Sequence, residues 1–381
     1  MSDSPNGVCI VTQPQRSSAG KDHAHDLANI IAEISTVSIL TANLSSDSDL
    51  RDDHEVIEFS AKGTGENVFT EALRFFLNQL RLCRAITTRQ EDTILFFGTT
   101  SYILPVVWSK IIGKTVLVLP RGDVPLSLQL RWEKTMPDTL ARVLAGAVAL
   151  LENLNYRLAD AIITYTPSMA DQLGLGRYEK KLFTSGARYI DTSKFDVQVP
   201  FEEREMVVGF IGRLDVEKRM PELAVAAKKL PENIRFVFVG DGNYREQLEK
   251  ELAEEIEEGK VELVGWVDRG DVPEQLNRLR LQIVPSHPTE GLPTAILEGM
   301  AWGTPAFETP VSGVPEVVRE GETGFLMDDV DGEQIAMEIE DILAREDLDG
   351  ISISSRKLIE GEYGFEAAVT RYDAILTSSC I

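Results

Sequence analysis

Short apolar runs alternate with amphipathic helical stretches along this chain of 381 residues. In the first half six such runs lie between Val8–Val11 and Ala161–Thr164, and in the second half five lie between Val207–Ile211 and Pro305–Phe307. Runs this short are typical of strands buried on both faces, and their alternation with helices is typical of parallel sheets. Because the pattern occurs twice, we expect an α/β protein with two Rossmann-like domains.

A polar stretch at residues 191–205 separates the two halves. It carries Pro200 and shows no hydrophobic periodicity, as is usual for a linker between domains. We therefore expect an N-terminal domain over residues 1–195 and a C-terminal domain over residues 206–361. Residues 362–381 carry apolar side chains at helical spacing and predict a closing helix.

The chain is strongly acidic, with 38 Lys and Arg against 62 Asp and Glu and a formal net charge of −24. Such a surface repels phosphate backbones, so nucleic acid is not an expected partner. Only 14 of the basic residues are lysines. An acidic, lysine-poor composition suggests a halophilic protein, since concentrated salt screens the self-repulsion of its charges. An acidic mesophilic enzyme is the alternative.

Cysteine content and hydropathy point to the cytoplasm. The three cysteines Cys9, Cys83 and Cys380 are far apart, which fits a reducing compartment and argues against a zinc site. No export signal or membrane-spanning run is visible. Residues 126–158 are rich in Leu and contain Arg131, Trp132, Arg142 and Arg157. This segment is either an amphipathic face for peripheral contact with the inner membrane face or an ordinary packed helix pair.

The stretch from Ser286 to Glu298 follows an apolar run and opens a helix. Pro293 suits a first helical turn, so backbone N–H groups at Gly291 and Leu292 are expected at a helix N-terminus, where a diphosphate can bind. The carboxylates of Glu290 and Glu298 would flank that anion and accept hydrogen bonds from sugar and ribose hydroxyls. In the alternative reading, Glu290 caps the helix and Glu298 lies on a solvated face.

A second group of candidates follows the run Val207–Ile211. Gly212 is a candidate donor-binding residue there, and Arg213 and Lys218 place two cations beyond the end of a strand. An Arg fork and a Lys point charge together neutralise a leaving diphosphate without a metal, so no metal site is expected. The alternative is that both cations pair on the surface with Asp215 or Glu217.

These motifs together resemble the retaining glycosyltransferases of family 4, which have the GT-B fold. The resemblance rests on motifs that occur in the family's order, namely Gly212-Arg213-Leu214 with Lys218, Val239-Gly240-Asp241-Gly242, Val264-Gly265-Trp266-Val267, Glu290 with Glu298, Gly303-Thr304-Pro305 and Gly313-Val314-Pro315-Glu316. It covers residues 207–326 firmly and the first half only loosely. It implies two parallel sheets that face an interdomain cleft, with the last helix packing back toward the N-terminal domain.

The resemblance implies a metal-independent transferase whose co-substrate is a UDP- or GDP-linked sugar, with no other cofactor. The C-terminal domain would hold this donor, with Arg213 and Lys218 on its diphosphate, Glu290 on its sugar and Glu298 on its ribose. Trp266 and Val267 would lie near the base. The N-terminal domain would bind a hydroxyl acceptor, either a glycan or a lipid-linked glycan.

Two positions depart from the family's pattern. Its first loop usually has a Gly-Gly pair, whereas this chain offers only Gly20 for a close backbone approach to the donor. Where many members have a His after a mid-domain strand, this chain reads Pro120-Arg121-Gly122-Asp123. Arg121 or Asp123 could contact the acceptor, or the loop simply turns at Gly122. A sugar phosphorylase, a nucleotide-sugar epimerase and a catalytically silent sugar-nucleotide-binding protein are the alternative functions.

Overall fold

The computed structural model describes residues 6–379 apart from 13–17, 43, 45–48, 61–67, 101, 187, 193–198, 269, 286 and 288–290, and for 18–22, 49 and 68–73 it describes the backbone only. The chain divides into two compact units. The first unit consists of Met1–Arg188 with Phe365–Ile381, and the second unit is Tyr189–Gly364. The division falls just before the polar stretch at 191–205, and the closing helix belongs to the first unit.

The first unit is built on a seven-stranded parallel sheet with the order β3-β2-β1-β4-β5-β6-β7. Its strands are β1 Val8–Val11, β2 Val37–Ala42, β3 Glu55–Ser60, β4 Thr93–Phe97, β5 Thr115–Leu119, β6 Ala161–Ile163 and β7 Leu182–Phe183. Every residue of β1 and β4 is buried, as expected for strands covered by helices on both faces.

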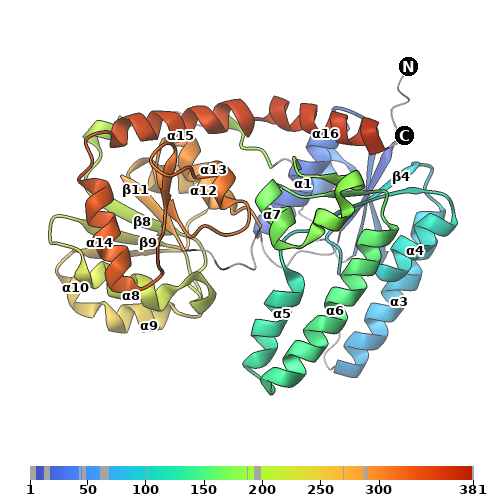
Figure 1. Cartoon of the computed structure of the whole chain (residues 1–381), viewed down its shortest axis with the longest axis horizontal. Helices are drawn as coiled ribbons and strands as arrows, with labels where there is room; N and C mark the ends of the chain where they lie inside the picture. The colour runs from blue at the N-terminus through green and yellow to red at the C-terminus, as the bar shows by residue number, and fades with distance from the viewer. Residues whose placement is uncertain are drawn as a thin grey trace. The chain divides into compact units, whose positions relative to one another are not determined.

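Helices cover both faces of this sheet (Figure 1). They are α1 Ser18–Ala32, α2 Asp49–Asp53, α3 Val68–Thr87, α4 Ile103–Ile111, α5 Val124–Glu133, α6 Asp138–Leu158, α7 Pro167–Gln172, the 3₁₀ segment η1 Leu175–Lys181 and α16 Phe365–Ser379. Right-handed crossovers place α1 on one face and α3, α4 and α6 on the other. In agreement, α1 contacts α16, and α4 contacts both α3 and α6.

The second unit repeats the architecture with a six-stranded parallel sheet of order β10-β9-β8-β11-β12-β13. Its strands are β8 Val207–Ile211, β9 Arg235–Val239, β10 Val261–Gly265, β11 Leu281–Val284, β12 Ala306–Glu308 and β13 Gly324–Leu326. Its helical segments are η3 Phe201–Glu203, η4 Val216–Lys218, α8 Met220–Lys229, α9 Arg245–Glu251, α10 Ala253–Glu257, α11 Val272–Asn277, α12 Thr294–Ala301, α13 Val314–Val317, α14 Gly332–Leu343 and α15 Leu348–Glu362.

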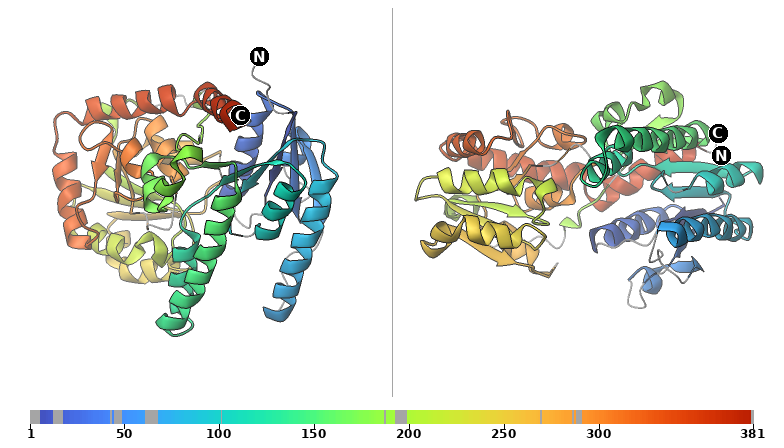
Figure 2. Two further views of the ribbon diagram at one scale, coloured as in Figure 1. Left: turned by 45° about the vertical axis from the view of Figure 1, so that its right-hand side comes forward. Right: turned by 90° about the horizontal axis from the view of Figure 1, so that it is seen from below.

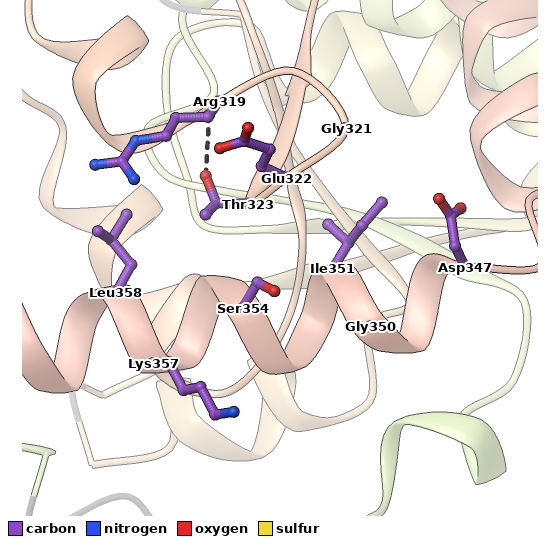
Figure 3. Close-up of a pocket in the computed structure, with 10 residues that line it drawn as sticks. All are labelled: Arg319, Gly321, Glu322, Thr323, Asp347, Gly350, Ile351, Ser354, Lys357 and Leu358. Carbon is purple, nitrogen blue, oxygen red and sulfur yellow. Dashed lines mark hydrogen bonds between the residues drawn. The ribbon is translucent and has the colours of Figure 1, made fainter.

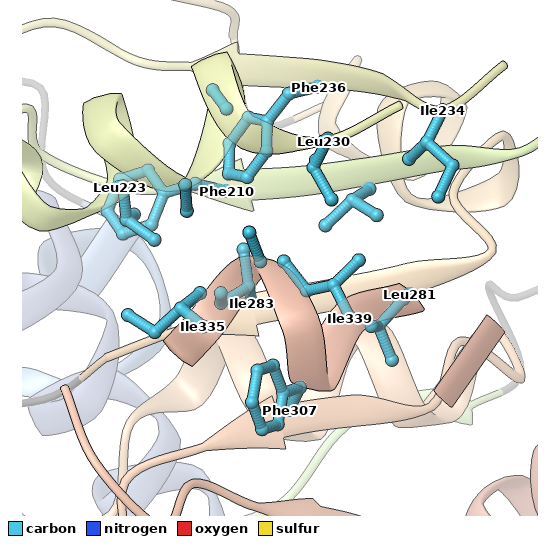
Figure 4. Close-up of a cluster of buried hydrophobic side chains, with 14 of the residues drawn as sticks. Phe210, Leu223, Leu230, Ile234, Phe236, Leu281, Ile283, Phe307, Ile335 and Ile339 are labelled. Carbon is cyan, nitrogen blue, oxygen red and sulfur yellow. The ribbon is translucent and has the colours of Figure 1, made fainter. Parts of the chain in front are cut away.

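The core of the second unit lies between this sheet and the helices α8 and α14. Phe210, Phe236 and Ile283 project from the strands toward Ile335 and Ile339 of α14 (Figure 4). These side chains are almost fully buried. The interdigitated core fixes where each strand ends, and therefore where the loops that follow the strands begin.

The predicted α/β fold with two parallel sheets is confirmed. The apolar runs become strands within one or two residues of the expected bounds, and β7 and β13 extend the sheets by one strand each. β7 has only two residues, and β13 begins at Gly324, a residue type disfavoured in strands, so the sequence analysis identified neither.

The end of the expected linker is a buried anchor of the second unit. Arg204 is only 4% exposed, and it donates hydrogen bonds to the carbonyls of Leu279 (2.9 Å) and Trp302 (2.7 Å) and to the hydroxyl of Thr304 (2.9 Å). Burial lowers the pKa of this guanidinium to about 10. The reading of residues 191–205 as linker is therefore wrong for this position, because a lone Arg in a polar stretch carries no periodic signal.

Candidate functional site

The strand order of the second unit reverses between β8 and β11. In open parallel sheets, ligands bind beyond the carboxyl ends of the strands at such a switch point, because the connecting loops diverge there and leave room for a molecule. The loop after β8 contains Gly212, Arg213 and Lys218, and the segment after β11 leads into α12. The sequence-predicted donor residues on these two segments therefore share one edge of one sheet.

The loops after β8 and β9 touch through their backbones. Gly212 donates its N–H to the carbonyl of Val239 (3.0 Å), and a Cβ on Gly240 would lie 1.9 Å from the carbonyl oxygen of Gly212. Gly240 also has a φ of +133°, which L side chains rarely adopt. Its N–H bonds the carbonyl of Gly265 at the end of β10 (2.8 Å). Only glycine fits at position 240, and the three loops form one hydrogen-bonded layer.

Arg213 is held at the surface by its neighbour two residues on. Its guanidinium donates to one carboxylate oxygen of Asp215, and the other oxygen accepts the backbone N–H of Asn243 (3.0 Å). The Arg213 side chain is 59% exposed, whereas that of Asp215 is 13% exposed. The surface pairing that the sequence left as an alternative is therefore present, and it fixes the guanidinium at the sheet edge with most of its surface open to a ligand.

Lys218 closes a short 3₁₀ turn, η4, and its N–H bonds the carbonyl of Asp215 (2.8 Å). The turn brings the chain back toward the sheet edge before α8 starts at Met220. The side chain of Lys218 is half-buried. Two cations from one loop thus lie beside the switch point.

Helix α12 begins at Thr294, with Pro293 as its extended N-cap residue, one position before the first turn in which the sequence analysis placed it. No acidic residue lies in the first turn, so its positive dipole end is not neutralised from within. Leu292 and Gly291, just before this helix, are buried. Glu298 is half-buried in the middle of α12. Glu290 lies outside the described residues.

The orientation of α12 depends on a glutamine that sequence reasoning missed. Gln282, fully buried in β11, donates its side-chain amide to the carbonyl of Ala295 (3.0 Å) in the first turn of α12. A Cβ on Gly299 would lie 1.8 Å from the Gln282 Oε1 atom, so glycine is required where the helix crosses the strand. The sequence did contain a signal for this contact. It is a polar residue inside an apolar run, followed by a glycine five residues into the next helix.

Trp266 and Val267 follow the end of β10. Trp266 is 66% exposed, a large open area for an indole. Val267 is half-buried and packs against the small core cluster that includes Val207, Val237 and Val239. Trp266 therefore presents a free ring to solvent at the same sheet edge as Arg213.

The remaining predicted residues belong to the first unit. Gly20 lies in the first turn of α1, which follows β1 at that sheet's own switch point between β1 and β4. Arg121 follows β5 and stacks over the ring of Phe97, 4.9 Å from its centroid. Burial lowers the pKa of Arg121. Asp123 caps α5 by accepting the N–H of Leu126 (2.9 Å).

Asp123 also lines a pocket between α5, α6 and α7 together with Gln129, Arg142 and Glu152. Glu152 is 4% exposed and accepts hydrogen bonds from the hydroxyls of Thr99 (3.0 Å) and Thr100. Burial raises the pKa of this carboxyl. The sequence analysis missed Glu152, because a single Glu in a Leu- and Ala-rich helix looks like a surface position.

A larger open pocket in the second unit lies at the opposite edge of its sheet. It is bounded by the turn from Arg319 to Thr323 and by α15, including Ser354 and Lys357 (Figure 3). Thr323 accepts the backbone N–H of Arg319 (2.9 Å) and tightens this turn. Because the turn leads into β13, the pocket lies at the amino ends of the strands, away from Arg213 and Lys218.

Two classes of feature are absent from the part of the chain that the structure describes. His, Cys, Asp and Glu side chains form no group of three that could bind a metal ion. None of the described helices combines the length and the apolar character needed to cross a bilayer.

Comparisons with known proteins agree with this geometry. Residues 191–360 match the family described as "Glycosyl transferases group 1". The lipopolysaccharide core biosynthesis glycosyltransferase LpsE of Rhizobium meliloti is 28% identical over 285 residues, which cover 69% of this chain and 82% of LpsE. The alpha-D-kanosaminyltransferase of Streptomyces kanamyceticus is 25% identical over 310 residues, covering 76% of this chain and 77% of that protein.

The fold matches a solved structure over its whole length. Anabaena HepE, whose crystal structure is in complex with UDP-glucose, superposes with a TM-score of 0.73 at 16% identity, covering 98% of this chain and 99% of HepE. The predicted GT-B fold and the resemblance to glycosyltransferases are confirmed at this level. The narrower assignment to family 4 stays a prediction.

Proposed function

Because residues 191–360 match the group 1 glycosyl transferases, we propose that the protein transfers a sugar from a nucleotide diphosphate sugar to a hydroxyl acceptor with retention of anomeric configuration. The observation that carries the proposal is the pair of cations on the loop after β8, beside the switch point to β11. There Arg213, fixed by Asp215, and Lys218 flank the place that the strand order favours for a ligand.

The diphosphate is the part of the donor that this edge suits best. A guanidinium can bind two phosphate oxygens at once, and an ammonium adds a point charge. The N-terminus of α12, with no acidic residue in its first turn, adds backbone N–H donors. These groups supply the positive charge that in other enzymes comes from a metal ion, so we propose a reaction without a metal or another cofactor.

The ends of the donor have proposed partners on either side of the diphosphate. Glu290, just before α12, would accept a hydrogen bond from the transferred sugar, and Glu298, within α12, from the ribose. The open ring of Trp266 is suited to contact the base, with Val267 supporting the loop from the core. UDP-linked sugars are the first donors that we would test, because the crystal structure of HepE is in complex with UDP-glucose.

The proposed chemistry is electrostatic. The bond from the anomeric carbon to the diphosphate oxygen breaks, and its electron pair leaves with the diphosphate, whose charge Arg213 and Lys218 stabilise. The acceptor oxygen forms the new bond on the face that the leaving group vacates, and its proton passes to a diphosphate oxygen. No side chain needs to act as the general base.

The proposed acceptor is a glycan or a lipid-linked glycan, bound by the first unit. The name of LpsE refers to lipopolysaccharide core biosynthesis, which supports an acceptor of this class. Asp123 and the pocket that it lines with Gln129 and Glu152 offer carboxylate and amide groups of the kind that bind sugar hydroxyls. The proposed compartment is the cytoplasm, supported by the free thiols of Cys9 and Cys83.

Thermal stability in the presence of UDP-, GDP-, ADP- and CDP-linked sugars, at low and at molar KCl, tests the donor proposal. A ligand that binds only the folded protein raises Tm, so a rise with one nucleotide class is expected. The rise should be lost in Arg213→Ala and reduced in Glu298→Ala. Arg235→Ala, an exposed Arg on β9 that pairs with Glu205, is the control and should keep it. No rise with any donor would contradict the proposal.

A further inference from the structure

Helices α3 and α6 are much longer than the strands they cover. They contain 20 and 21 residues, about 30 Å each, whereas β4 and β5 contain five residues, about 17 Å. The C-terminal end of α3 is level with that of α4, because Trp108 donates its indole N–H to the hydroxyl of Thr87 (2.9 Å). The excess length of α3 therefore projects past the carboxyl edge of the sheet, as Figures 1 and 2 show for both α3 and α6.

The outward sides of these two helices are apolar. Among the side chains that the structure describes, 17 large hydrophobic ones are exposed, and ten of these lie on α3 and α6. On α6 they follow the spacing of one helical stripe, at Leu140, Leu144, Leu151 and Leu154, and the flanking Val143 and Leu150 are about 70% exposed, at 69% and 72%. Exposed apolar side chains that gather on a few helices in this way mark interaction surfaces.

The inward side of α6 is, by contrast, partly polar. The buried residues of α6 are Ala141, Ala145, Glu152, Asn155 and Tyr156. α6 thus turns two small and three polar side chains toward the unit and its leucines toward solvent. Such an arrangement is the reverse of a helix whose apolar stripe serves its own core.

Helix α3 and the hairpin of α5 and α6 complete this surface. On α3, Phe75, Phe76 and Leu80 are between 47% and 51% exposed, whereas Gln79, Leu82 and Ile86 are buried. Helix α5 packs along α6 with its three Leu and its Trp half-buried, and its Arg131 is exposed. We call the exposed sides of α3, α5 and α6 the α3–α6 face.

The charge of this region is opposite to that of the rest of the chain. On α3, α5, α6 and the turn after α5, the exposed cations are Arg81, Arg84, Arg131, Lys134, Arg142 and Arg157, whereas Asp138 is the one exposed carboxylate among their described residues, in a chain of net charge −24. After Asp138, the one carboxylate of α6 is Glu152, and it is turned inward to Thr99. The α3–α6 face therefore combines exposed apolar side chains with a local excess of cations.

We propose that the α3–α6 face binds the surface of an anionic lipid bilayer. Apolar side chains on helices lying at the interface enter the boundary between headgroups and acyl chains, and Lys and Arg bind the anionic headgroups. A second copy of this chain is a less suitable occupant, because a symmetric dimer would bring two cationic faces together. The inference concerns a surface distinct from the donor site and does not depend on the proposed reaction.

Co-flotation of the full chain with vesicles tests the proposal without any sugar nucleotide. We expect binding to vesicles of phosphatidylglycerol and at least about tenfold weaker binding to vesicles of phosphatidylcholine. The double variant Val143→Ser/Leu150→Ser should weaken binding at least about tenfold. The matched control is Val225→Ser/Ile353→Ser, two exposed apolar residues of the second unit, and it should bind like the wild type.

A second pair of substitutions separates the electrostatic contribution to binding from the apolar one. Arg84→Glu/Arg157→Glu, on exposed positions of α3 and α6, should weaken binding to phosphatidylglycerol and leave the circular dichroism spectrum unchanged. Folded protein that floats with neither vesicle, or equally with both, would overturn the proposal. So would a concentration-dependent dimer, seen by light scattering and lost in Val143→Ser/Leu150→Ser, that forms without vesicle binding.

Discussion

The carboxylate of Asp215 joins the guanidinium of Arg213 to the backbone N–H of Asn243, one oxygen on each. Asp215 lies after β8 and Asn243 after β9, so the cation is positioned by two neighbouring strands of the sheet. A ligand that binds Arg213 does not have to order this side chain first, which lowers the entropic cost of binding. The pair is therefore a preorganised part of the candidate site.

Arg213→Ala should reduce kcat/KM by ~100-fold or more, the loss expected if the cation contributes ~3 kcal/mol to the transition state. Asp215→Asn keeps an acceptor for Asn243 but removes the charge that holds Arg213, and about a tenfold loss is expected. The double variant should be no worse than Arg213→Ala alone, because Asp215 acts through Arg213. Steady-state kinetics with the donor identified by thermal shift measures all three. Additive losses, or an Arg213→Ala enzyme near wild-type activity, would contradict this role.

Gly240→Ala should destabilise the protein by about 2 kcal/mol or more, because the new Cβ would meet the carbonyl of Gly212 and the positive φ adds strain. Gly350→Ala is the matched control. Gly350 lies in α15 of the same unit with no atom within 4 Å of its would-be Cβ, so alanine should raise stability by about 0.5 to 1 kcal/mol. Urea denaturation of both variants measures the difference, and equal effects would show that the backbone contact at position 240 is not tight.

Arg204→Leu should lower the free energy of unfolding by about 3 kcal/mol or more, because three buried acceptors lose their donor. Arg235→Leu removes an Arg of equal charge from an exposed pair with Glu205 and should change stability by less than about 1 kcal/mol. Chemical denaturation distinguishes the two. A loss in Arg204→Leu as small as that of the control would mean that water replaces the guanidinium.

Stability should depend on pH through Glu152. Because burial raises its pKa in the folded protein above the usual 4.5, the folded state retains a proton that the unfolded state has lost. The destabilisation of the folded state by the buried Glu152 carboxyl is absent below pH 4.5, and it grows as pH rises through the pKa of this carboxyl in the folded protein. Glu152→Gln should therefore raise Tm at pH 7, and the gain should shrink as pH falls toward 4.5. Glu254→Gln, an exposed site on α10, controls for the lost charge. A gain independent of pH would contradict this account.

Periodicity predicted most of the fold because parallel strands buried on both faces must be continuously apolar. Val8–Val11 and Val207–Ile211 became strands at the residues expected. β13 was not predicted, since it begins at Gly324, a residue type disfavoured in strands, and its pairing with β12 supplies the order. The burial of Arg204 was not predicted for a different reason. Its burial depends on carbonyls 75 and 98 residues away, which no local pattern records.

The candidate site was predictable where backbone geometry dictates residue type. Gly212 and the loop to Lys218 follow from a strand end that leads into a helix, and the structure places them at the switch point. The pairing of Arg213 with Asp215 was only one of two readings, because charge spacing alone does not say whether a cation is held or free. Glu152 and Gln282 are buried polar residues, and their partners became visible only with the fold.

Helix α16 completes the first unit with residues that follow the whole second unit in the sequence. Its buried side chains include Ala368, Tyr372 and Ile375, and it packs against α1 near the other end of the chain. As the polypeptide leaves the ribosome, the surface that Tyr372 covers beside Leu27 and Tyr165 stays open until the entire second unit has been made. The first unit is thus completed only after the second unit and α16 have been synthesised, and a chain terminated before Phe365 would expose an uncovered apolar surface to chaperones and proteases.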